Sequence, residues 1–154
     1  MINISWEQYV KYVDVICQEF KNKALFVRDI DSVYGIPRGG VILAVLLSHK
    51  LNLKYIDDIK KIDSNVLVVD DIFDSGNTIN RFFKNLNLIN IKTAAIVVNE
   101  KSNIKASFYS FFNISNEWIN FPYEDCKYKC GRCHDTGEVI LYELGESIKC
   151  PSCN

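Results

Sequence analysis

Glycine and proline are scarce in this chain. Its 154 residues include seven glycines and three prolines, about half the frequency of an average protein. Because these two residues form tight turns at low cost, most turns here are built without them, and the few that are present mark segments with special backbone geometry. All ten lie in four short segments, which are therefore the first places to look for function: Gly35, Pro37, Gly39 and Gly40; Gly76; Pro122; and Gly131, Gly137, Gly145 and Pro151.

Three further absences limit the class of protein. With 18 basic and 19 acidic side chains the net charge is −1, so no overall positive field draws nucleic acid or an anionic membrane. Charged side chains interrupt the first 20 residues, which do not resemble a signal peptide, and the longest apolar run, Val41–Leu47, is too short to span a bilayer. We therefore expect a cytoplasmic protein that takes a small ligand and contacts no membrane.

The apolar periodicity predicts an α/β fold. A capping-box pattern at Ser5–Gln8 precedes apolar residues at helical spacing from Trp6 to Phe20. Helices alternate with short apolar strands, which is typical of a mostly parallel sheet flanked by helices, with ligands at the carboxyl ends of its strands. The further elements we expect are helices at 41–51 and 77–86, strands at 32–36, 53–56, 66–69, 93–98 and 106–112, and an irregular segment at 116–125.

An acidic segment follows the predicted strand at 66–69 and leads into a helix. Backbone N–H groups at a helix start can hold a phosphate, Gly76 would let the anion approach, and the Ser75 and Thr78 hydroxyls can donate. The carboxylates of Asp70 and Asp71 can accept hydrogen bonds from ribose hydroxyls or ligate magnesium. The structural alternative is that Asp74 or Ser75 only caps the helix. The full segment reads Asp70-Asp71-Ile72-Phe73-Asp74-Ser75-Gly76-Asn77-Thr78.

A second glycine-containing turn follows the predicted strand at 32–36. Gly35-Ile36-Pro37-Arg38-Gly39-Gly40 opens a helix and places a permanently charged guanidinium beside its first backbone N–H groups. The sequence therefore predicts a second anion site at the same edge of the sheet.

Together the two motifs resemble those of the type I phosphoribosyltransferases, whose signature is a hydrophobic strand followed by Asp-Asp-x-x-Asp-Ser/Thr-Gly-x-Thr. The resemblance covers residues 1–125, is closest to the 6-oxopurine (xanthine, guanine, hypoxanthine) enzymes, and implies their fold. It also implies magnesium-dependent transfer of ribose 5-phosphate from phosphoribosyl pyrophosphate (PRPP) to a purine base, giving a nucleoside monophosphate and diphosphate.

The resemblance also implies roles for individual residues. Asp74 would be catalytic and manage the N7 proton of the base, and a cis peptide bond is expected between Pro37 and Gly39. The diphosphate would bind Pro37, Arg38, Gly39 and Gly40. The ribose phosphate would bind Asp70, Asp71, Asp74, Ser75, Gly76, Asn77 and Thr78.

Residues 113–125 resemble the segment that covers the base in these enzymes, and we call them the hood. The resemblance implies that Trp118 stacks on the purine and that backbone carbonyls from Ile119 on read its 2-position. Lys101 is the candidate for reading O6, with Asn99 as the alternative. The structural alternative is that Trp118 and Phe121 are core aromatics covering a sheet edge.

One part of the family pattern is shortened. These enzymes have a long mobile loop before the Asp-Asp strand, whereas here only nine residues, 57–65, are available. Lys60 and Lys61 could still reach the diphosphate, or a neighbouring subunit of the homo-oligomer that we expect could cover the site. The alternative function is therefore a non-catalytic protein on the same fold that senses PRPP or a nucleotide, or binds a partner.

Four of the six cysteines form two Cys-x-x-Cys pairs, Cys130/Cys133 and Cys150/Cys153, with strand-like segments at 139–142 and 147–149 between them. Four thiolates at this spacing suit a closed, tetrahedral structural zinc site. Residues 126–154 resemble a zinc ribbon, in which Cys126 and His134 are bystanders. Nucleic-acid binding by this module is the less favoured use. Cys17 fits the apolar side of the first helix.

We expect about one zinc ion per chain, because a site of four cysteines binds one tetrahedral ion. Metal analysis of chelator-free protein should show zinc lost in Cys150→Ser and retained in Cys17→Ser. Equal zinc in both variants would contradict a four-cysteine site.

Overall fold

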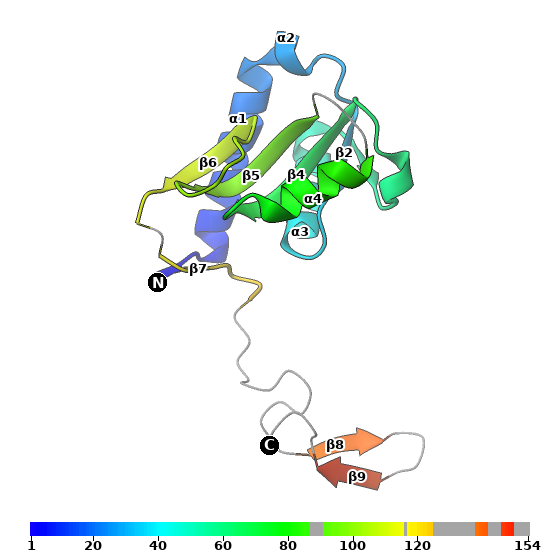
Figure 1. Cartoon of the computed structure of the whole chain (residues 1–154), viewed down its shortest axis with the longest axis vertical. Helices are drawn as coiled ribbons and strands as arrows, with labels where there is room; N and C mark the ends of the chain where they lie inside the picture. The colour runs from blue at the N-terminus through cyan, green and yellow to red at the C-terminus, as the bar shows by residue number, and fades with distance from the viewer. Residues whose placement is uncertain (87–90, 116, 125–137, 142–145, 150–154) are drawn as a thin grey trace.

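The computed structural model describes residues 1–86, 91–115, 117–124, 138–141 and 146–149. Its centre is a five-stranded sheet with strand order β3-β2-β4-β5-β6 (Figure 1). Each pair of neighbouring strands in this sheet is parallel, which confirms the predicted α/β class. The strands are β2 (Ser32–Gly35), β3 (Lys54–Ile56), β4 (Val66–Phe73), β5 (Lys92–Asn99) and β6 (Phe108–Asn113).

The first helix begins as predicted. The Ser5 side chain accepts a hydrogen bond from the Gln8 N–H, and the Gln8 side chain accepts one from the Ser5 N–H, so the capping box is present. The apolar side of this helix is buried, Cys17 included. The described helices are α1 (Trp6–Asn22), α2 (Ala24–Val27), α3 (Gly39–Leu51) and α4 (Asn77–Leu86), with a short 3-10 helix, η1 (Ile59–Lys61).

Helices cover both faces of the sheet, and β4 shows how the sequence specifies this. Alternate residues of a strand point to opposite faces. Leu67 and Val69 pack in the core cluster that contains the buried side of α1 and α3. Val66 and Val68 pack in a second cluster with Ile79 of α4. The continuous apolar run at 66–69 is therefore that of a strand buried on both faces.

The winding of the chain reverses between β2 and β4. From β2 the chain continues outward to β3, and from β4 it continues outward to β5 on the other side. In such sheets ligands bind outside the carboxyl ends of the strands at the reversal point. Gly35 at the end of β2 pairs with Val69 of β4, so the segments that follow these two strands start side by side.

Three differences between the structure and the sequence prediction bear on the site, and the ends of β2, β3, β5 and β6 shift by one or two residues. β4 continues to Phe73, so Asp70 and Asp71 are strand residues, and α3 begins at Gly39 rather than residue 41. The prediction that residues 116–125 are irregular is wrong at Ile119–Asn120. These two residues form β7, which pairs in parallel with β1 (Ile2–Asn3). Each of these two strands has two residues and its partner lies far away along the chain, so no local pattern announces the pairing.

The short connection before β4, residues 57–65, packs against the sheet. Its Ile62 side chain is buried in the cluster on the α4 side of the sheet. Lys61 pairs with Asp57 (Nζ to Oδ1, 3.6 Å) and lines a small cavity at the start of β2, β3 and β4. That cavity lies at the opposite end of the strands from the predicted anion sites.

The predicted zinc ligands Cys130, Cys133, Cys150 and Cys153 lie outside the described residues, as do Cys126, His134 and the expected domain boundary at 125/126. The described part of the C-terminal segment is an antiparallel pair of strands, β8 (Glu138–Leu141) and β9 (Glu146–Lys149). This agrees with the strands expected there, and the zinc site stays a prediction. None of the described helices has the length and apolar character needed to cross a membrane.

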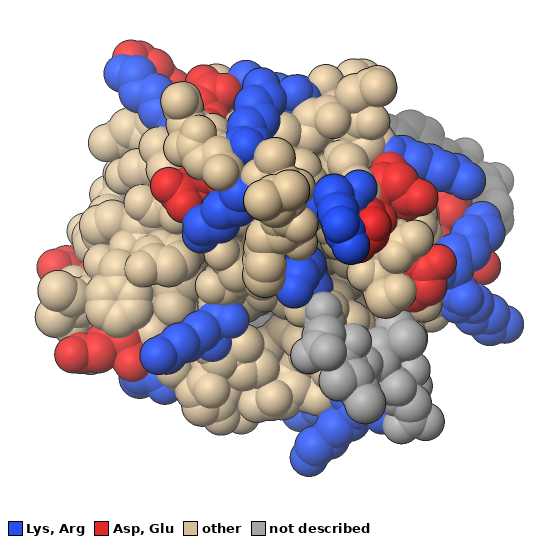
Figure 2. All heavy atoms as spheres, turned by 90° about the horizontal axis from the view of Figure 1, so that it is seen from above, with Lys and Arg blue, Asp and Glu red and all other residues tan. Residues whose placement is uncertain are grey.

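Charges of both signs are interspersed on the face at the α2 end of the molecule (Figure 2). Ion pairs among these exposed side chains include Lys23–Glu19 and Arg28–Asp29. This face therefore offers no field of a single sign, in line with the balanced composition.

Two aromatic residues of the hood, Trp118 and Phe121, differ in burial, which predicts different effects on stability. Phe121 is 2% exposed and Trp118 is 71% exposed. Phe121→Ala should lower the free energy of unfolding by about 3–5 kcal/mol, because it leaves a cavity in the core. Trp118→Ala should change it by less than about 0.5 kcal/mol. Urea unfolding measures both, and equal losses would contradict this assignment of core and surface.

Candidate functional site

Two cavities meet over the carboxyl ends of β2, β4 and β5. The first, of about 530 Å³, is lined by residues 37–39 and 70–76 together with the start of α4. The second, of about 310 Å³, is lined by Asn99, Lys101 and residues 117–119. Asp71, Ile72, Asp74 and Glu124 line both. One ligand can therefore extend from one cavity into the other past these residues.

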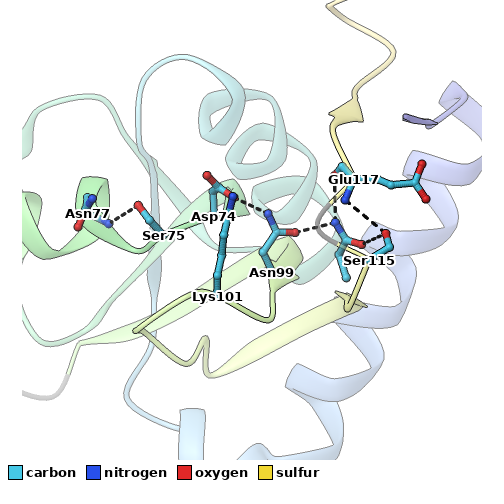
Figure 3. A network of polar contacts seen from close by, with 8 residues as sticks. Asp74, Ser75, Asn77, Asn99, Lys101, Ser115 and Glu117 are labelled. Atoms are coloured by element: carbon cyan, nitrogen blue, oxygen red, sulfur yellow. Dashed lines mark hydrogen bonds and ion pairs between the residues drawn. The ribbon is translucent and has the colours of Figure 1, made fainter.

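Residues 74–78, which we call the Asp74 loop, join β4 to α4. Gly76 has φ = +82°, a conformation that favours glycine, and a Cβ atom there would lie 2.2 Å from the Asn103 side-chain oxygen. The Ser75 hydroxyl oxygen accepts a hydrogen bond from the Asn77 N–H (3.3 Å; Figure 3). Ser75, Gly76 and Thr78 line the first cavity. The loop thus presents hydroxyls and a helix start to the same space, as an anion site requires.

Residues 36–40, which we call the Arg38 loop, lie against the end of β4. The Pro37–Arg38 peptide bond is cis, within the interval expected from the sequence. A Cβ atom on Gly39 would lie 1.7 Å from an Asp71 carboxylate oxygen, so a larger residue would displace this carboxylate. Pro37, Arg38 and Gly39 line the first cavity. Gly40 is not among the lining residues; it is buried against the backbone of β4.

The two carboxylates at the end of β4 have different environments. Burial, and next the charge of Asp71, raise the pKa of Asp70 to about 8, so at pH 7 this carboxyl is mainly protonated. The Asp71 carboxylate accepts hydrogen bonds from the Ile72 N–H (2.8 Å) and the Tyr123 hydroxyl (2.7 Å). The pair thus presents one oriented carboxylate beside one buried, uncharged carboxyl group.

Asp70 and Asp71 are also the oxygen donors here that could contact a divalent cation. In phosphate-binding sites Mg²⁺ takes one or two carboxylates and completes its shell with phosphate oxygens and water. The described residues contain no group of three or more side chains that could hold a metal ion. This donor set fits a magnesium ion that arrives on a diphosphate, and does not form a protein cage.

Asp74 is held by two donors. Its Oδ1 accepts hydrogen bonds from Lys101 Nζ (2.8 Å) and Asn99 Nδ2 (2.5 Å; Figure 3). The Lys101 contact is the main cause of a lowered pKa, with Asn99 contributing. Asp74 is therefore a carboxylate at neutral pH, and its Oδ2 accepts no hydrogen bond from the described residues, so it can take a proton from a ligand.

The hood supplies the apolar part of the second cavity. Trp118 and Ile119 line it together with Lys101 and Asn99, so the four candidates for contact with a base lie around one space. The alternative that Trp118 and Phe121 are both core residues holds for Phe121 alone. The Phe121 ring stacks on that of Tyr123 (centroids 5.5 Å apart).

Three residues at the site were not predicted from the sequence. Tyr123 reaches Asp71 from 52 residues away, Glu124 lines both cavities, and Asn103 packs on Gly76. None has a spacing that signals these contacts. Conversely, Lys60 and Lys61, which were considered for the diphosphate, are not among the residues lining either cavity.

Part of the chain matches the model of a known domain family. Residues 57–126 match the model of the phosphoribosyl transferase domain. A xanthine-guanine phosphoribosyltransferase of Chromohalobacter salexigens is 31% identical over 94 residues, which are 49% of this chain and 55% of the relative. The chain thus spans about half the length of this curated relative. The Arg38 loop lies outside the residues that match the domain model.

Two solved structures are similar in fold. A purine phosphoribosyltransferase from Pyrococcus horikoshii has a TM-score of 0.64 at 24% identity, over 80% of this chain and 94% of that one. A xanthine-guanine-hypoxanthine phosphoribosyltransferase of Helicobacter pylori has a TM-score of 0.62 at 23% identity, over 80% and 93%. At these identities the likeness concerns the fold, which is that of the phosphoribosyltransferases, with the expected sheet flanked by helices.

The raised pKa of Asp70 predicts a pH effect on stability. The folded protein binds a proton at Asp70 up to about pH 8, whereas the unfolded chain releases it near the ordinary aspartate pKa of 3.8. The free energy of unfolding should therefore decrease as the pH rises from about 4 to about 8. Asp70→Asn, which cannot ionise, should gain stability relative to wild type across this interval. Urea unfolding at pH 5, 7 and 9 without magnesium measures this, with Asp57→Asn as exposed control; a pH-independent difference would contradict it.

Proposed function

We propose that this protein is a purine phosphoribosyltransferase that transfers ribose 5-phosphate from PRPP to a 6-oxopurine base. The observation that carries the proposal is the junction of the two cavities at Asp71 and Asp74. The first cavity has two glycine-containing helix starts suited to phosphates, and the second has an exposed tryptophan suited to a flat base. The ribose, which must be joined to both, would occupy the junction.

In this proposal PRPP lies along the first cavity. Its 5-phosphate binds the Asp74 loop, and its diphosphate binds the Arg38 loop, where the Arg38 guanidinium has no ion-pair partner among the described residues. The ribose hydroxyls donate to the carboxyl oxygens of Asp70 and Asp71. Magnesium, bound with PRPP, would neutralise charge on the leaving diphosphate.

The transfer forms a bond between N9 of the base and C1′ and breaks the bond between C1′ and the diphosphate oxygen, which keeps the electron pair. The N7 proton of the base passes to the free Oδ2 of Asp74. The chain's contribution is chiefly to hold the two reactants in line and to keep Asp74 ionised.

The second cavity supports recognition of a 6-oxopurine. Stacking on Trp118 would contribute about 1–3 kcal/mol. Lys101, with one contact to Asp74 and further N–H groups available, would donate to O6, and the Ile119 carbonyl would read the 2-position. The predicted zinc module and homo-oligomer stay part of the proposal, the zinc as the stabiliser of the C-terminal module and a neighbouring subunit as a cover for the site.

The second candidate function is binding of PRPP or a nucleotide without transfer. The short connection at 57–65 favours this second function, because none of its residues lines either cavity. A reaction through an oxocarbenium-like state needs water to be excluded, for which the related enzymes use a long loop at this position.

The two functions are separated by one pair of measurements with magnesium present. Nucleotide formation is followed with PRPP and guanine, xanthine, hypoxanthine or adenine in turn, and PRPP binding is measured by calorimetry. We expect nucleotide from at least one 6-oxopurine and little from adenine. Binding of PRPP without nucleotide from any base would reject the transferase in favour of the second function.

Asp74→Asn tests the proton acceptor. The amide cannot take the N7 proton, so kcat should fall by about 100-fold or more, while PRPP affinity stays within about twofold because both loops are intact. Asp29→Asn, an exposed carboxylate beside α2, is the matched control. A kcat equal to that of the control would remove Asp74 from this role.

A further inference from the structure

A chain of hydrogen bonds leads from Asp74 to the hood backbone next to Trp118 (Figure 3). Asn99 Nδ2 donates to Asp74 Oδ1, and Asn113 Nδ2 donates to Asn99 Oδ1 (2.8 Å). Asn113 Nδ2 also donates to the carbonyl oxygen of Glu117 (3.1 Å). The Ser115 hydroxyl donates to Asn113 Oδ1 (2.8 Å) and accepts from the Glu117 N–H (3.3 Å).

The sheet brings the two asparagines together. Asn99 and Asn113 are the last residues of β5 and β6 and are partners in the parallel register. They are 4% and 1% exposed, so each amide must find its hydrogen bonds inside the protein. Asn113 lines neither cavity, although its side chain donates to both Asn99 and the Glu117 carbonyl.

The direction of every bond in the chain is fixed. A backbone carbonyl can only accept, so the Asn113 NH₂ group must face Glu117 and, with its second hydrogen, Asn99. Asn99 must then present its oxygen to Asn113 and its NH₂ group to Asp74. On the opposite side of Asn113 the Ser115 hydroxyl donates to Asn113 Oδ1, which agrees with an NH₂ group turned toward Glu117 and Asn99. The outcome is a donor, never an acceptor, beside the Asp74 carboxylate.

We propose that Asn113 is a positioning residue that sets the orientation of the Asn99 amide and thereby ties the carboxylate of Asp74 to the hood at Glu117 and Trp118. The inference rests on the proposed function only in assigning Asp74 and Trp118 to the base site. One buried amide thus connects the hydrogen bond on the proton acceptor with the backbone beside the stacking ring, so the two parts of the base site respond together when it changes.

Two substitutions break the chain in different ways. Asn113→Asp replaces the donor with an acceptor, so the Asn99 amide turns its NH₂ group toward residue 113 and its oxygen toward Asp74. Ser115→Ala removes only an exposed hydroxyl, so this variant should fold even if the substitution of the buried Asn113 prevents folding. Ser115→Thr restores the hydroxyl. Asn3→Asp, at an amide contact with Asn120 outside the chain, is the matched control.

The first readout is kinetic. We expect kcat/KM for the base to fall by about tenfold in Ser115→Ala, the loss of one neutral hydrogen bond, and by about 100-fold in Asn113→Asp. KM for PRPP should stay unchanged, and Ser115→Thr and Asn3→Asp should behave as wild type. Equal losses for base and PRPP, or a loss that follows the melting temperature, would show a merely structural role and overturn the proposal.

The second readout needs no turnover. Carboxyl-carbon NMR of the free protein should show the pKa of Asp74 higher in Asn113→Asp and Ser115→Ala than in wild type, while Asn3→Asp leaves it unchanged. The other ionisable groups that share the cavities with Asp74 are the same in every variant: Arg38, Asp70, Asp71, Lys101, Glu117, Tyr123 and Glu124. An unmoved pKa in both variants would overturn the proposal. If wild type makes no nucleotide, the transferase is rejected and this titration still decides the positioning role.

Discussion

The close backbone packing of the Arg38 loop against the end of β2 and against β4 is the constraint on which the site depends. A side chain at Gly35 would meet the Gly40 carbonyl at 2.3 Å, and one at Gly40 would meet the Val69 carbonyl at 2.5 Å. With Gly39 against Asp71, three positions leave no room for a Cβ atom. Because these three glycines have no side chains, the Arg38 loop can pack on the carboxylates of β4. Charges of both signs therefore border one cavity.

Within this frame, similar residues have different chemical states. Asp70 and Asp74 lie four residues apart on one segment, yet burial raises the pKa of one and the Lys101 contact lowers that of the other. The difference follows from position: Asp70 belongs to the covered part of β4, and Asp74 follows the end of the strand where solvent and Lys101 reach it. The segment therefore offers a neutral carboxyl group and an ionised one four residues apart.

The sequence predicted the parts of the molecule that depend on neighbours along the chain. The capping box at Ser5, the turn at Gly76 and the sheet with helices on both faces follow from local residue types and apolar spacing. The end of β4 did not, because its apolar run stops at Val69 while pairing with β5 continues to Phe73. Tyr123 on Asp71 and Asn99 beside Asn113 were also missed, since tertiary contacts alone bring them together. The cysteine ligands stay predictions.

The pairing of β1 with β7 has a consequence for how a base would be read. The Trp118 and Asn120 carbonyls accept hydrogen bonds from the Ile2 and Ile4 N–H groups. Successive carbonyls of a strand point to opposite sides, so the Ile119 carbonyl is turned away from β1. In the proposed site the group that reads the purine 2-position is thus part of the backbone. Exchanging the Ile119 side chain would leave that acceptor in place, and selectivity there would change only if the path of the main chain changed.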